Sequence, residues 1–513
     1  MKKQSLIKGS IILGIAGILT RFLGLFFRWP LIMLIGDEGV GYYQMSYPLY
    51  MFFVAMASGV PVAISKIISE NNVTGKQRNN YTVVKEAFFL MLIIGTGTSV
   101  VLSVFAKPII NFLQWDTKSY YSLIGISMAP IIVGILTIFR GFFQGYQNMT
   151  PSAISQILEQ VGRIIFGVGL AIILLPKGIE YSAGGAASGA AGGGLLALIY
   201  LFHKYKIVKK ISGIRKVKSD PNVLNKILMI SIPISLGATV GSVMSLIDSI
   251  LVPKQLLEAG FSSNEATVLF AQLTGKANVI VNIPLTLSIA ICTSLIPIIA
   301  EVYLLNMKKA LESKINLAIK LSAVISIPCM FGLFFMAEPI MKFIFPGRYE
   351  GIEILKYLSL SIPFIIITQT TTSIIQGVGS YILPVINLFV GCIVKIVLTI
   401  SLVPQKDINI FGAVIATLGA YFVVTMLNVI VIKVKLGVKM QLYSNFIKPA
   451  YATIFMIIAV LTLYNLFYTN TKSNSLSCLL SISIGAIIYS IGILVLRVFS
   501  VQELRGKLKR GNK

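Results

Sequence analysis

Six basic residues lie inside stretches that are otherwise predicted to be membrane-spanning helices, and their chemistry is that of an anion-binding site. A cation at the centre of a bilayer costs roughly 2.5–3.5 kcal/mol on insertion scales. A chain that keeps such residues usually directs them toward a water-filled cavity or an anionic partner. Guanidinium groups fork onto phosphate oxygens, and lysine adds a mobile point charge. The six residues are Arg21, Arg28, Arg140, Arg163, Lys276 and Lys395.

The depths of these cations differ. Arg21 lies about 12 residues into the first predicted span, roughly 18 Å deep. Arg28 is one to two turns nearer the outer face, and Lys276 enters the eighth span from outside by roughly 14 Å. Arg163 lies near the middle of the fifth span and follows Glu159 by one helical turn. A pair with Glu159 on the helix surface is therefore as good an explanation of Arg163 as a ligand role.

Acidic residues are scarcer than cations inside the predicted spans. Asp248, near the outer end of the seventh span, is a candidate partner of Lys276 or a ligand of a coupling ion. Lys395 has no acid within its own span, which favours a solvated cavity around it. Arg140 lies near the cytoplasmic end of its span, so its side chain is expected to snorkel to the interface. We expect the two arginines of the first span and Lys276 to line a cavity, with salt bridges between helices as the alternative.

The composition is that of a polytopic membrane protein. The chain has 513 residues, of which 56% are hydrophobic and 12% charged, whereas soluble domains carry about 25% charged residues. The net charge of +26 lies in short loops, which indicates cytoplasmic loops near anionic lipids rather than nucleic-acid binding. The four cysteines lie far apart in apolar segments and His203 is the only histidine. We therefore expect no disulfide, no metal site and no histidine-based catalytic dyad.

Apolar runs near the length of a bilayer crossing recur along the whole chain, and they predict an all-α fold with fourteen transmembrane helices. The loops after even-numbered spans are richer in lysine and arginine, so both termini are expected to be cytoplasmic. The tyrosines at 42, 43, 47 and 50 are expected to anchor the protein at the interface. The predicted spans are about 9–35, 42–68, 81–106, 119–143, 152–175, 183–203, 223–252, 267–301, 312–337, 353–378, 381–403, 410–434, 446–468 and 476–499.

The two halves of the chain resemble each other at an offset of about 232 residues. The Gln-Gly pair at 144–145 recurs at 376–377, and Arg163 matches Lys395. The repeating unit has six spans, so both copies face the same way and are related by an axis along the membrane normal, with the substrate site expected between them near mid-membrane. The expected parts are an N-lobe at 1–203, a basic cytoplasmic linker at 204–222, a C-lobe at 223–434, and spans thirteen and fourteen with a basic tail at 435–513.

Three segments resemble the stage V sporulation protein B family of bacterial polysaccharide transporters: TRFLGLFFRWPLIMLIGDEGVGYYQMSYPLY, FRGFFQGYQNMTPSAISQILEQVGRI and MSLIDSILVP. That family belongs to the multidrug/oligosaccharidyl-lipid/polysaccharide exporter superfamily. The resemblance implies a MATE-like fold in the bacterial cell membrane, with two six-helix lobes and two further helices. It also implies a flippase, not an enzyme, that moves an undecaprenyl-pyrophosphate-linked peptidoglycan precursor, lipid II, to the outer leaflet by alternating access for spore cortex synthesis.

In lipid II flippases, arginines on the first, second and eighth helices line a cationic cavity. The resemblance gives this role to Arg21 and Arg28, and to Lys276 in place of an arginine, while the second span lacks an arginine. Some relatives bind sodium through acids on helices seven and eleven. Asp248 matches the first of these acids, but span eleven offers Asn387, so the coupling ion, proton or sodium, is left open and no other cofactor is expected. The implied partners are a lipid-linked pyrophosphate, membrane lipids and cell-wall synthesis proteins.

Other functions stay open on the sequence alone. One is the export of a different lipid-linked oligosaccharide. Another is a drug or cation exporter of related fold, which would need acids in its cavity, and a third is a major-facilitator-type carrier. The last is a membrane scaffold for cell-wall assembly that transports nothing, for which the central cations would be replaceable.

Overall fold

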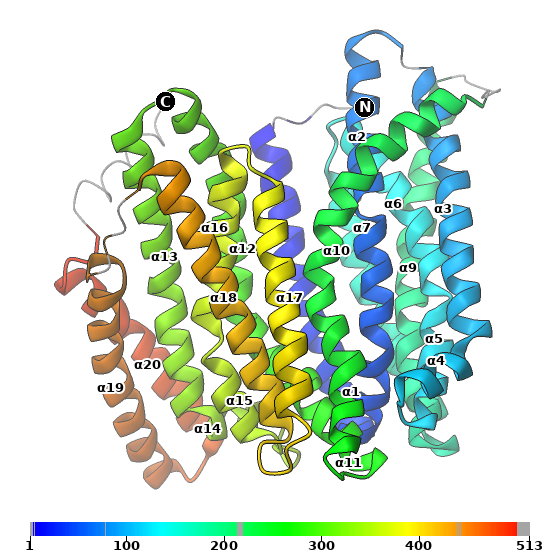
Figure 1. Ribbon diagram of the computed structural model, residues 1–513. Helices are drawn as coiled ribbons and strands as arrows, with labels where there is room; N and C mark the ends of the chain where they lie inside the picture. Colours follow the sequence, from blue (N-terminus) through cyan, green and yellow to red (C-terminus); the bar gives the residue numbers. More distant parts are fainter. Residues whose placement is uncertain are drawn as a thin grey trace. The chain divides into compact units, whose positions relative to one another are not determined.

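The computed structural model describes residues 4, 6–76, 78–212, 219–438, 441 and 443–499, and every regular element in these residues is a helix (Figure 1). The predicted all-α membrane fold is confirmed. Among the described residues, 12 helices are long and apolar enough to cross a membrane, or up to 13 when the bent pair Ile352–Ser359 and Ile362–Gly377 forms one span. Residues 213–218 of the linker predicted at 204–222 lie outside the described residues, as do the basic tail beyond residue 499 and the lysines at 2 and 3. The predicted orientation partly rests on these residues.

The first apolar stretch explains why this helix count falls short of the predicted fourteen. Ile12–Val73 is one helical run of 62 residues, roughly 93 Å long at 1.5 Å per residue, whereas a bilayer core is about 30 Å thick. The run breaks at Gly36, whose φ of 66° and ψ of −171° are not helical. Only glycine adopts this region readily. A run of this length with a break has room for two passages, in line with the two spans predicted at 9–35 and 42–68.

The chain divides into two compact units, Met1–Ala271 with Val403–Asp407 and Gln272–Leu402 with Ile408–Lys513, called unit 1 and unit 2 below. Unit 1 contains α10 (Pro221–Glu258), because this helix packs against α1, α2 and α3. The repeat predicts α10 as the first helix of the C-lobe. Lobes defined by sequence similarity and units defined by packing are different divisions, and the lobe boundaries stay a prediction.

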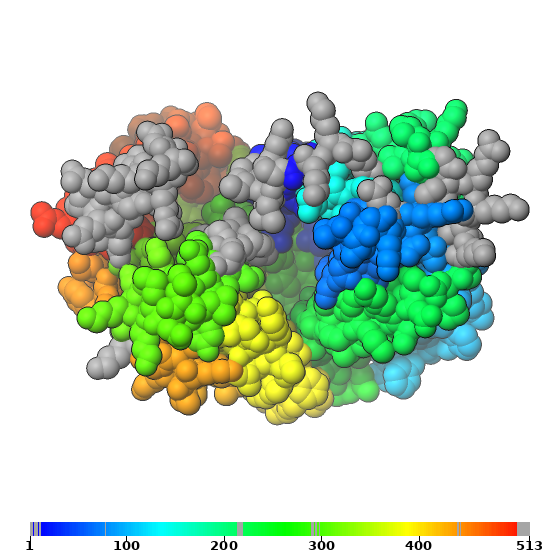
Figure 2. All heavy atoms as spheres, turned by 90° about the horizontal axis from the view of Figure 1, so that it is seen from above, coloured from blue at the N-terminus to red at the C-terminus, as the bar shows by residue number. Residues whose placement is uncertain are grey.

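Unit 1 is built around α2, α3, α6 and α9, whose buried residues form its core. Ile64, Ala87 and Phe142 are fully buried there. At one end of the unit the end of α2 and the beginning of α10, blue and green in Figure 2, lie side by side, and Lys226 Nζ binds Glu70 Oε2 at 2.6 Å. The helices are α1 (Leu6–Ala57), α2 (Gly59–Val73), α3 (Asn79–Val104), α4 (Ala106–Leu113), η1 (Thr117–Ser119), α5 (Tyr120–Ser127), α6 (Ala129–Gly145), α7 (Thr150–Arg163), η2 (Ile164–Val168), α8 (Gly169–Leu174), η3 (Leu175–Lys177), α9 (Ile179–Ile211), α10 and α11 (Ser263–Ala271).

Small residues bring α7 and α9 together in unit 1. A Cβ atom on Gly193 would lie 2.2 Å from the backbone oxygen of Glu159, and one on Gly162 would lie 2.8 Å from the Cα atom of Gly193. No side chain fits at such distances, so the glycine-rich run of α9 sets the close approach of the helix that carries Glu159 and Arg163.

Unit 2 has its core between α12, α13 and α16, where Ile299, Ile315 and Ile374 are fully buried. The last two helices pack against each other, and α19 also contacts α13. The helices are η4 (Gln272–Ala277), α12 (Asn278–Leu304), α13 (Lys308–Phe335), α14 (Ala337–Ile344), α15 (Ile352–Ser359), α16 (Ile362–Gly377), α17 (Ile382–Leu402), α18 (Ile410–Leu436), η5 (Tyr443–Ile447), α19 (Lys448–Thr471) and α20 (Asn474–Val495).

Candidate functional site

The two arginines of the first span lie on one side of α1. Arg21 and Arg28 are seven residues apart in the helix, which is close to two turns and places them one above the other. Arg21 is exposed and Arg28 is partly exposed. Among the residues that the structure describes, neither forms an ion pair. Both side chains are thus accessible cations inside an apolar span, and their contact with an anion stays a prediction.

A row of tyrosines follows the break of α1 at Gly36. The rings of Tyr43 and Tyr47 have their centroids 5.3 Å apart, and those of Tyr47 and Tyr50 are 6.0 Å apart. Tyr43 and Tyr50 are only 4% and 1% exposed, so these rings belong to the interior of unit 1. The expected role as interface anchors is wrong for them, because α1 continues past its break and buries this face.

Arg28 and Arg163 both lie within electrostatic range of the Tyr43 hydroxyl. Arg163 also donates a hydrogen bond from Nη1 to the Tyr47 hydroxyl at 3.3 Å, and its guanidinium carbon lies 6.0 Å from the centroid of that ring. The tyrosine row therefore connects the cation of α1 with the cation at the end of α7. The hydroxyl groups of this row supply polar partners in an otherwise apolar interior.

Glu159 lies between two arginines of unit 1. Its Oε2 is 2.8 Å from Arg140 Nη2, and its Oε1 is 3.5 Å from Arg163 Nη2. Arg140 Nε donates a second bond to Ser155 Oγ at 2.9 Å. The three charged side chains are only 10–14% exposed. The predicted pair of Glu159 and Arg163 is present, whereas Arg140 turns inward to this carboxylate instead of snorkelling outward.

The cluster of Arg140, Glu159 and Arg163 carries two positive charges and one negative charge. Buried charges are stable only when they are paired and hydrogen-bonded. One carboxylate shared by two guanidinium groups leaves a local excess of positive charge inside the unit. The π-helical segment η2 begins directly after Arg163, and single turns of this kind are common at functional sites.

Lys276 lies in unit 2 within the π-helical segment η4, and its side chain is completely buried. Its Nζ donates to the backbone oxygens of Arg348 at 2.8 Å and Glu350 at 3.3 Å, and it pairs with Glu350 Oε2 at 3.2 Å. The Phe345 ring lies 5.9 Å from the ammonium. In this structure Lys276 thus holds the loop between α14 and α15. A substrate contact for Lys276 stays a prediction, and it requires that this loop release the ammonium.

Glu350 was not predicted from the sequence, because it lies in a loop 74 residues beyond Lys276. Burial opposes ionisation of its carboxyl group, but hydrogen bonds from its own backbone amide and from Lys276 outweigh burial and keep its pKa below the usual glutamate value. Glu350 is therefore a carboxylate at neutral pH.

Asn387 and Lys395 of α17 are both buried in unit 2, at 7% and 2% exposure. Asn387 Nδ2 donates to Asn428 Oδ1 at 2.8 Å, and Asn428 Nδ2 donates to the hydroxyls of Thr371 and Thr372 at 3.1 Å each. This network joins α16, α17 and α18. The threonine run on α16 was its only visible signal in the sequence, and nothing singled out Asn428.

Asp248 lies on α10 in unit 1 and is 6% exposed. Its predicted roles, as a partner of Lys276 or as a ligand of a coupling ion, stay predictions. Among the described residues, no three histidine, cysteine, aspartate or glutamate side chains gather in a way that could hold a metal ion. The polar interior of unit 1 holds arginines and tyrosine hydroxyls, groups that can bind an anion by charge and hydrogen bonds, together with the buried carboxyl groups of Asp248 and Glu86.

Comparison with known proteins identifies a family and several relatives. The family described as "Polysaccharide biosynthesis protein" matches residues 6–303, and the MatE family matches residues 274–400. Stage V sporulation protein B of Bacillus subtilis is 27% identical over 517 residues, covering 98% of each chain. The lipid II flippase MurJ of the same organism is 26% identical over 457 residues, covering 84% of this chain and 83% of its own.

Solved structures share the fold. A structure described as lipid II flippase MurJ in an inward closed conformation aligns with a TM-score of 0.73 at 18% identity, covering 95% of this chain and 99% of the other. An inward-facing multidrug resistance MATE family transporter of the MOP superfamily aligns with a TM-score of 0.68 at 15% identity, covering 83% and 98%. At these identities the likeness concerns the fold alone.

Proposed function

Because this chain belongs to the polysaccharide biosynthesis protein family, we propose that it moves lipid II, the undecaprenyl-pyrophosphate-linked peptidoglycan precursor, from the inner to the outer leaflet for spore cortex synthesis. Its relatives are membrane flippases and exporters of the MOP superfamily, so its activity is transport across a membrane and not chemical conversion. One of these relatives is named for sporulation and another for the flipping of lipid II.

The observation that carries the proposal is the excess of cations in the cluster of Arg140, Glu159 and Arg163. Arg140 and Arg163 share the single carboxylate of Glu159, and Arg28 adds another cation near Tyr43. A pyrophosphate presents several oxygen acceptors, and guanidinium groups bind such oxygens in pairs. An exporter of cationic drugs would need the opposite balance, with carboxylates in excess over cations.

The cations act as binding groups and not as catalysts. Arg21 and Arg28 lie roughly 10 Å apart along the helix axis, so they offer successive contacts to a pyrophosphate that moves along α1. Binding energy shifts the protein between inward-open and outward-open states only when the substrate binds the two states differently. In our proposal two elements change conformation between such states. They are the helix break at Gly36 and the loop held by Lys276.

The test is complementation of cells depleted of their lipid II flippase, with outer-leaflet lipid II measured directly. We expect the wild-type chain to raise outer-leaflet lipid II. Arg28→Ala and Lys276→Ala should abolish this rise at unchanged expression. Lys309→Ala, which removes an exposed cation at the start of α13, is the matched control and should behave as wild type.

Three results would redirect the proposal. No rise in outer-leaflet lipid II would remove lipid II as the substrate and leave another lipid-linked oligosaccharide to be tested. Full activity of both alanine variants would exclude a pyrophosphate clamp made by these residues. Growth rescue without any lipid movement would point to a scaffold for cell-wall proteins. Collapse of the proton or sodium gradient in the same cells would identify the coupling ion.

A further inference from the structure

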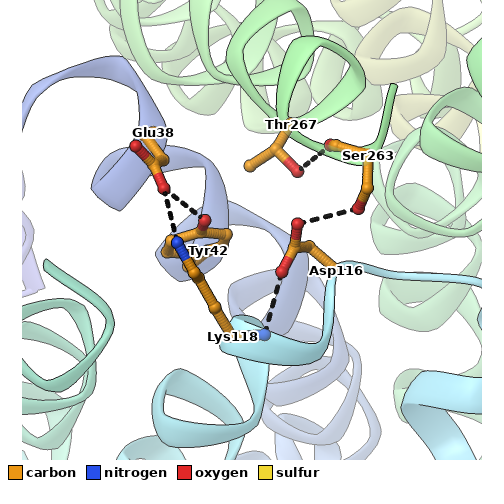
Figure 3. Close-up of polar contacts among 6 residues, drawn as sticks. All are labelled: Glu38, Tyr42, Asp116, Lys118, Ser263 and Thr267. Atoms are coloured by element: carbon orange, nitrogen blue, oxygen red, sulfur yellow. Dashed lines mark hydrogen bonds and ion pairs between the residues drawn. The ribbon is translucent and has the colours of Figure 1, made fainter. Parts of the chain in front are cut away.

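A corner of unit 1 is fixed by polar contacts to two other segments, α1 and α11 (Figure 3). Lys118 Nζ binds Glu38 Oε1 of α1 at 3.2 Å, and the same oxygen accepts a bond from the Tyr42 hydroxyl at 2.6 Å. Asp116 Oδ2 accepts a bond from Ser263 Oγ of α11 at 2.7 Å. The short connection between α4 and α5 is thereby held against both α1 and α11.

Trp115, the residue before Asp116, adds a contact to α10. Its indole nitrogen donates to the backbone oxygen of Ser249 at 2.8 Å, and its side chain is buried. Gln114 ends α4 in the left-handed region with φ of 54°, a conformation that costs energy for a residue other than glycine. The strained conformation of Gln114 and the contacts of Trp115 and Asp116 fix the conformation of this corner. A ligand is not needed to form it.

An open pocket of about 520 Å³ lies at this corner, between the end of α4, the end of α10 and the start of α11. Its polar lining consists of Asn111, Gln114, Glu258 and Ser263, and Trp115 supplies an aromatic wall. The volume is that of a small-molecule site. All of these residues belong to unit 1, and none of them has a part in the cationic cluster of Arg140 and Arg163.

The pocket lies beside the short helix α4. The face of α4 that carries Ile110 and Leu113 is buried, whereas Phe112 is 83% exposed. A short amphipathic helix that packs one face on the protein and exposes a phenylalanine is typical of a membrane interface. The orientation predicted from the loop charges puts this end of unit 1 on the outer side of the membrane, where the head group of a flipped lipid would enter water.

The lining chemistry suits an uncharged polar ligand. Two carboxamides and a hydroxyl donate and accept hydrogen bonds, and the carboxylate of Glu258 only accepts them. The lining carries one negative charge and no positive charge, so it repels phosphate. We propose that this pocket binds the neutral sugar of the lipid-linked substrate on the outer side, while the arginines of unit 1 bind its pyrophosphate. This proposal rests on the proposed function. It identifies the neutral sugar as the part of the substrate that the protein holds while the substrate is released.

The chain offers a direct probe, because it contains only two tryptophans, Trp29 and Trp115. In a Trp29→Phe background the emission of the full-length protein in nanodiscs reports on the pocket wall alone. The probe ligand is di-N-acetylchitobiose, a soluble neutral disaccharide of N-acetylated sugars. We expect a saturable change in the emission of Trp115, and we expect no saturable change with inorganic pyrophosphate.

Gln114→Gly tests the lining, and Gln147→Gly is its matched control. Gln147 is also an exposed glutamine at positive φ, 56°, but it lies outside the pocket. Glycine adopts this conformation without strain, so both variants should fold. Loss of one hydrogen-bonding side chain should weaken disaccharide binding by about tenfold in Gln114→Gly and leave it unchanged in Gln147→Gly. Asn111→Ala should weaken it similarly.

The outcomes separate this inference from the proposed function. Absence of a saturable response, or an equal response in Gln114→Gly, overturns the sugar site even when outer-leaflet lipid II rises in cells. A response to lysine methyl ester and not to the disaccharide also overturns it, because Glu258 would then define a site for amines. Disaccharide binding without any movement of lipid II keeps the sugar site and refutes the lipid II flippase.

Discussion

The same stretch of the internal repeat carries an ion cluster in unit 1, and in unit 2 it carries an amide network beside a single buried cation, Lys395. In unit 1 Arg140 and Arg163 share Glu159, and Arg140 also binds Ser155. At the offset of about 232 residues, the positions of Arg140, Ser155 and Glu159 are taken by Thr372, Asn387 and Gly391. Asn428 joins two of these through its amide group. Arg163 alone keeps a cation at its matched position, Lys395. One copy of the repeat thus holds a cluster of three charged side chains, and the other holds amides and hydroxyls with one lysine.

The difference between the two copies of the repeat indicates which copy is better suited to binding an anion. A buried amide network satisfies its own donors and acceptors and holds helices in register without a net charge. A buried ion cluster with more cations than acids costs desolvation energy, and that cost is offset when an anion arrives. The cluster of unit 1 is therefore the part suited to binding, and the network of unit 2 is the part suited to holding α16, α17 and α18 together.

Glu159→Gln should give the largest effect, because it removes the one carboxylate that both arginines share. Two buried guanidinium groups would lose their charge partner, and breaking a buried pair in this way costs about 3–5 kcal/mol. We expect a large fall in the melting temperature of the detergent-solubilised protein and partial recovery when a pyrophosphate-bearing lipid is added.

Glu70→Gln is the matched control for this change. Glu70 also pairs with a cation, Lys226, at 2.6 Å, but its side chain is 43% exposed. Exposed pairs contribute about 0–1 kcal/mol. Equal melting temperatures for the Glu159 and Glu70 variants would show that the cluster of unit 1 is not a buried charge site and would break the comparison.

Asn428→Ala should have a smaller effect, in unit 2. The substitution removes the acceptor of Asn387 and the donor to Thr371 and Thr372, and an unsatisfied buried group costs about 1–3 kcal/mol. The melting temperature should fall, and lipid transport at a temperature below the transition should be largely kept. Asn264→Ala, at an exposed position of α11, is the control. Loss of transport in a stable Asn428→Ala protein would place unit 2 in the binding step and contradict the division of roles.

The sequence predicts the helical framework because each span carries its own signal in length and apolar content. It also predicts the pair of Glu159 and Arg163, since both residues lie on one helix one turn apart. It misses the contact of Arg140 with the same Glu159, which depends on how α6 packs against α7. The pairing of Lys276 with Glu350 is missed for the same reason, because a loop position is decided by tertiary contacts.

Arg28 and the tyrosine row show a second limit of the sequence. Their closeness depends on the break of α1 at Gly36. The sequence does not indicate which of its 43 glycines adopts the φ of 66° that makes this break. Tyrosines in an apolar stretch are typical both of membrane interfaces and of polar interiors. Burial alone distinguishes the two, and burial is a property of the packed unit.

Glu350→Gln should give the smallest effect on the melting temperature. It tests whether unit 2 contains a buried charge site of its own. Glu350 pairs with the buried Lys276, but its own side chain is 57% exposed, so the loss should stay below about 1 kcal/mol. The lowered pKa of Glu350 sets the sign of the pH dependence. A carboxyl group with a lower pKa in the folded state stabilises the protein above its unfolded pKa, and this contribution is lost as the pH falls through the folded value.

The melting temperatures of wild type and Glu350→Gln should therefore differ slightly at neutral pH and converge in acid. Glu353→Gln, which removes the exposed partner of Lys356 at 3.2 Å, is the control for a pair between two surface groups. A fall as large as that of Glu159→Gln would mean that unit 2 contains a buried charge site of its own, held by Lys276. The contrast between an ion cluster and an amide network would then have to be restricted to the repeated helices, because η4 and the loop after α14 lie outside the matched stretch.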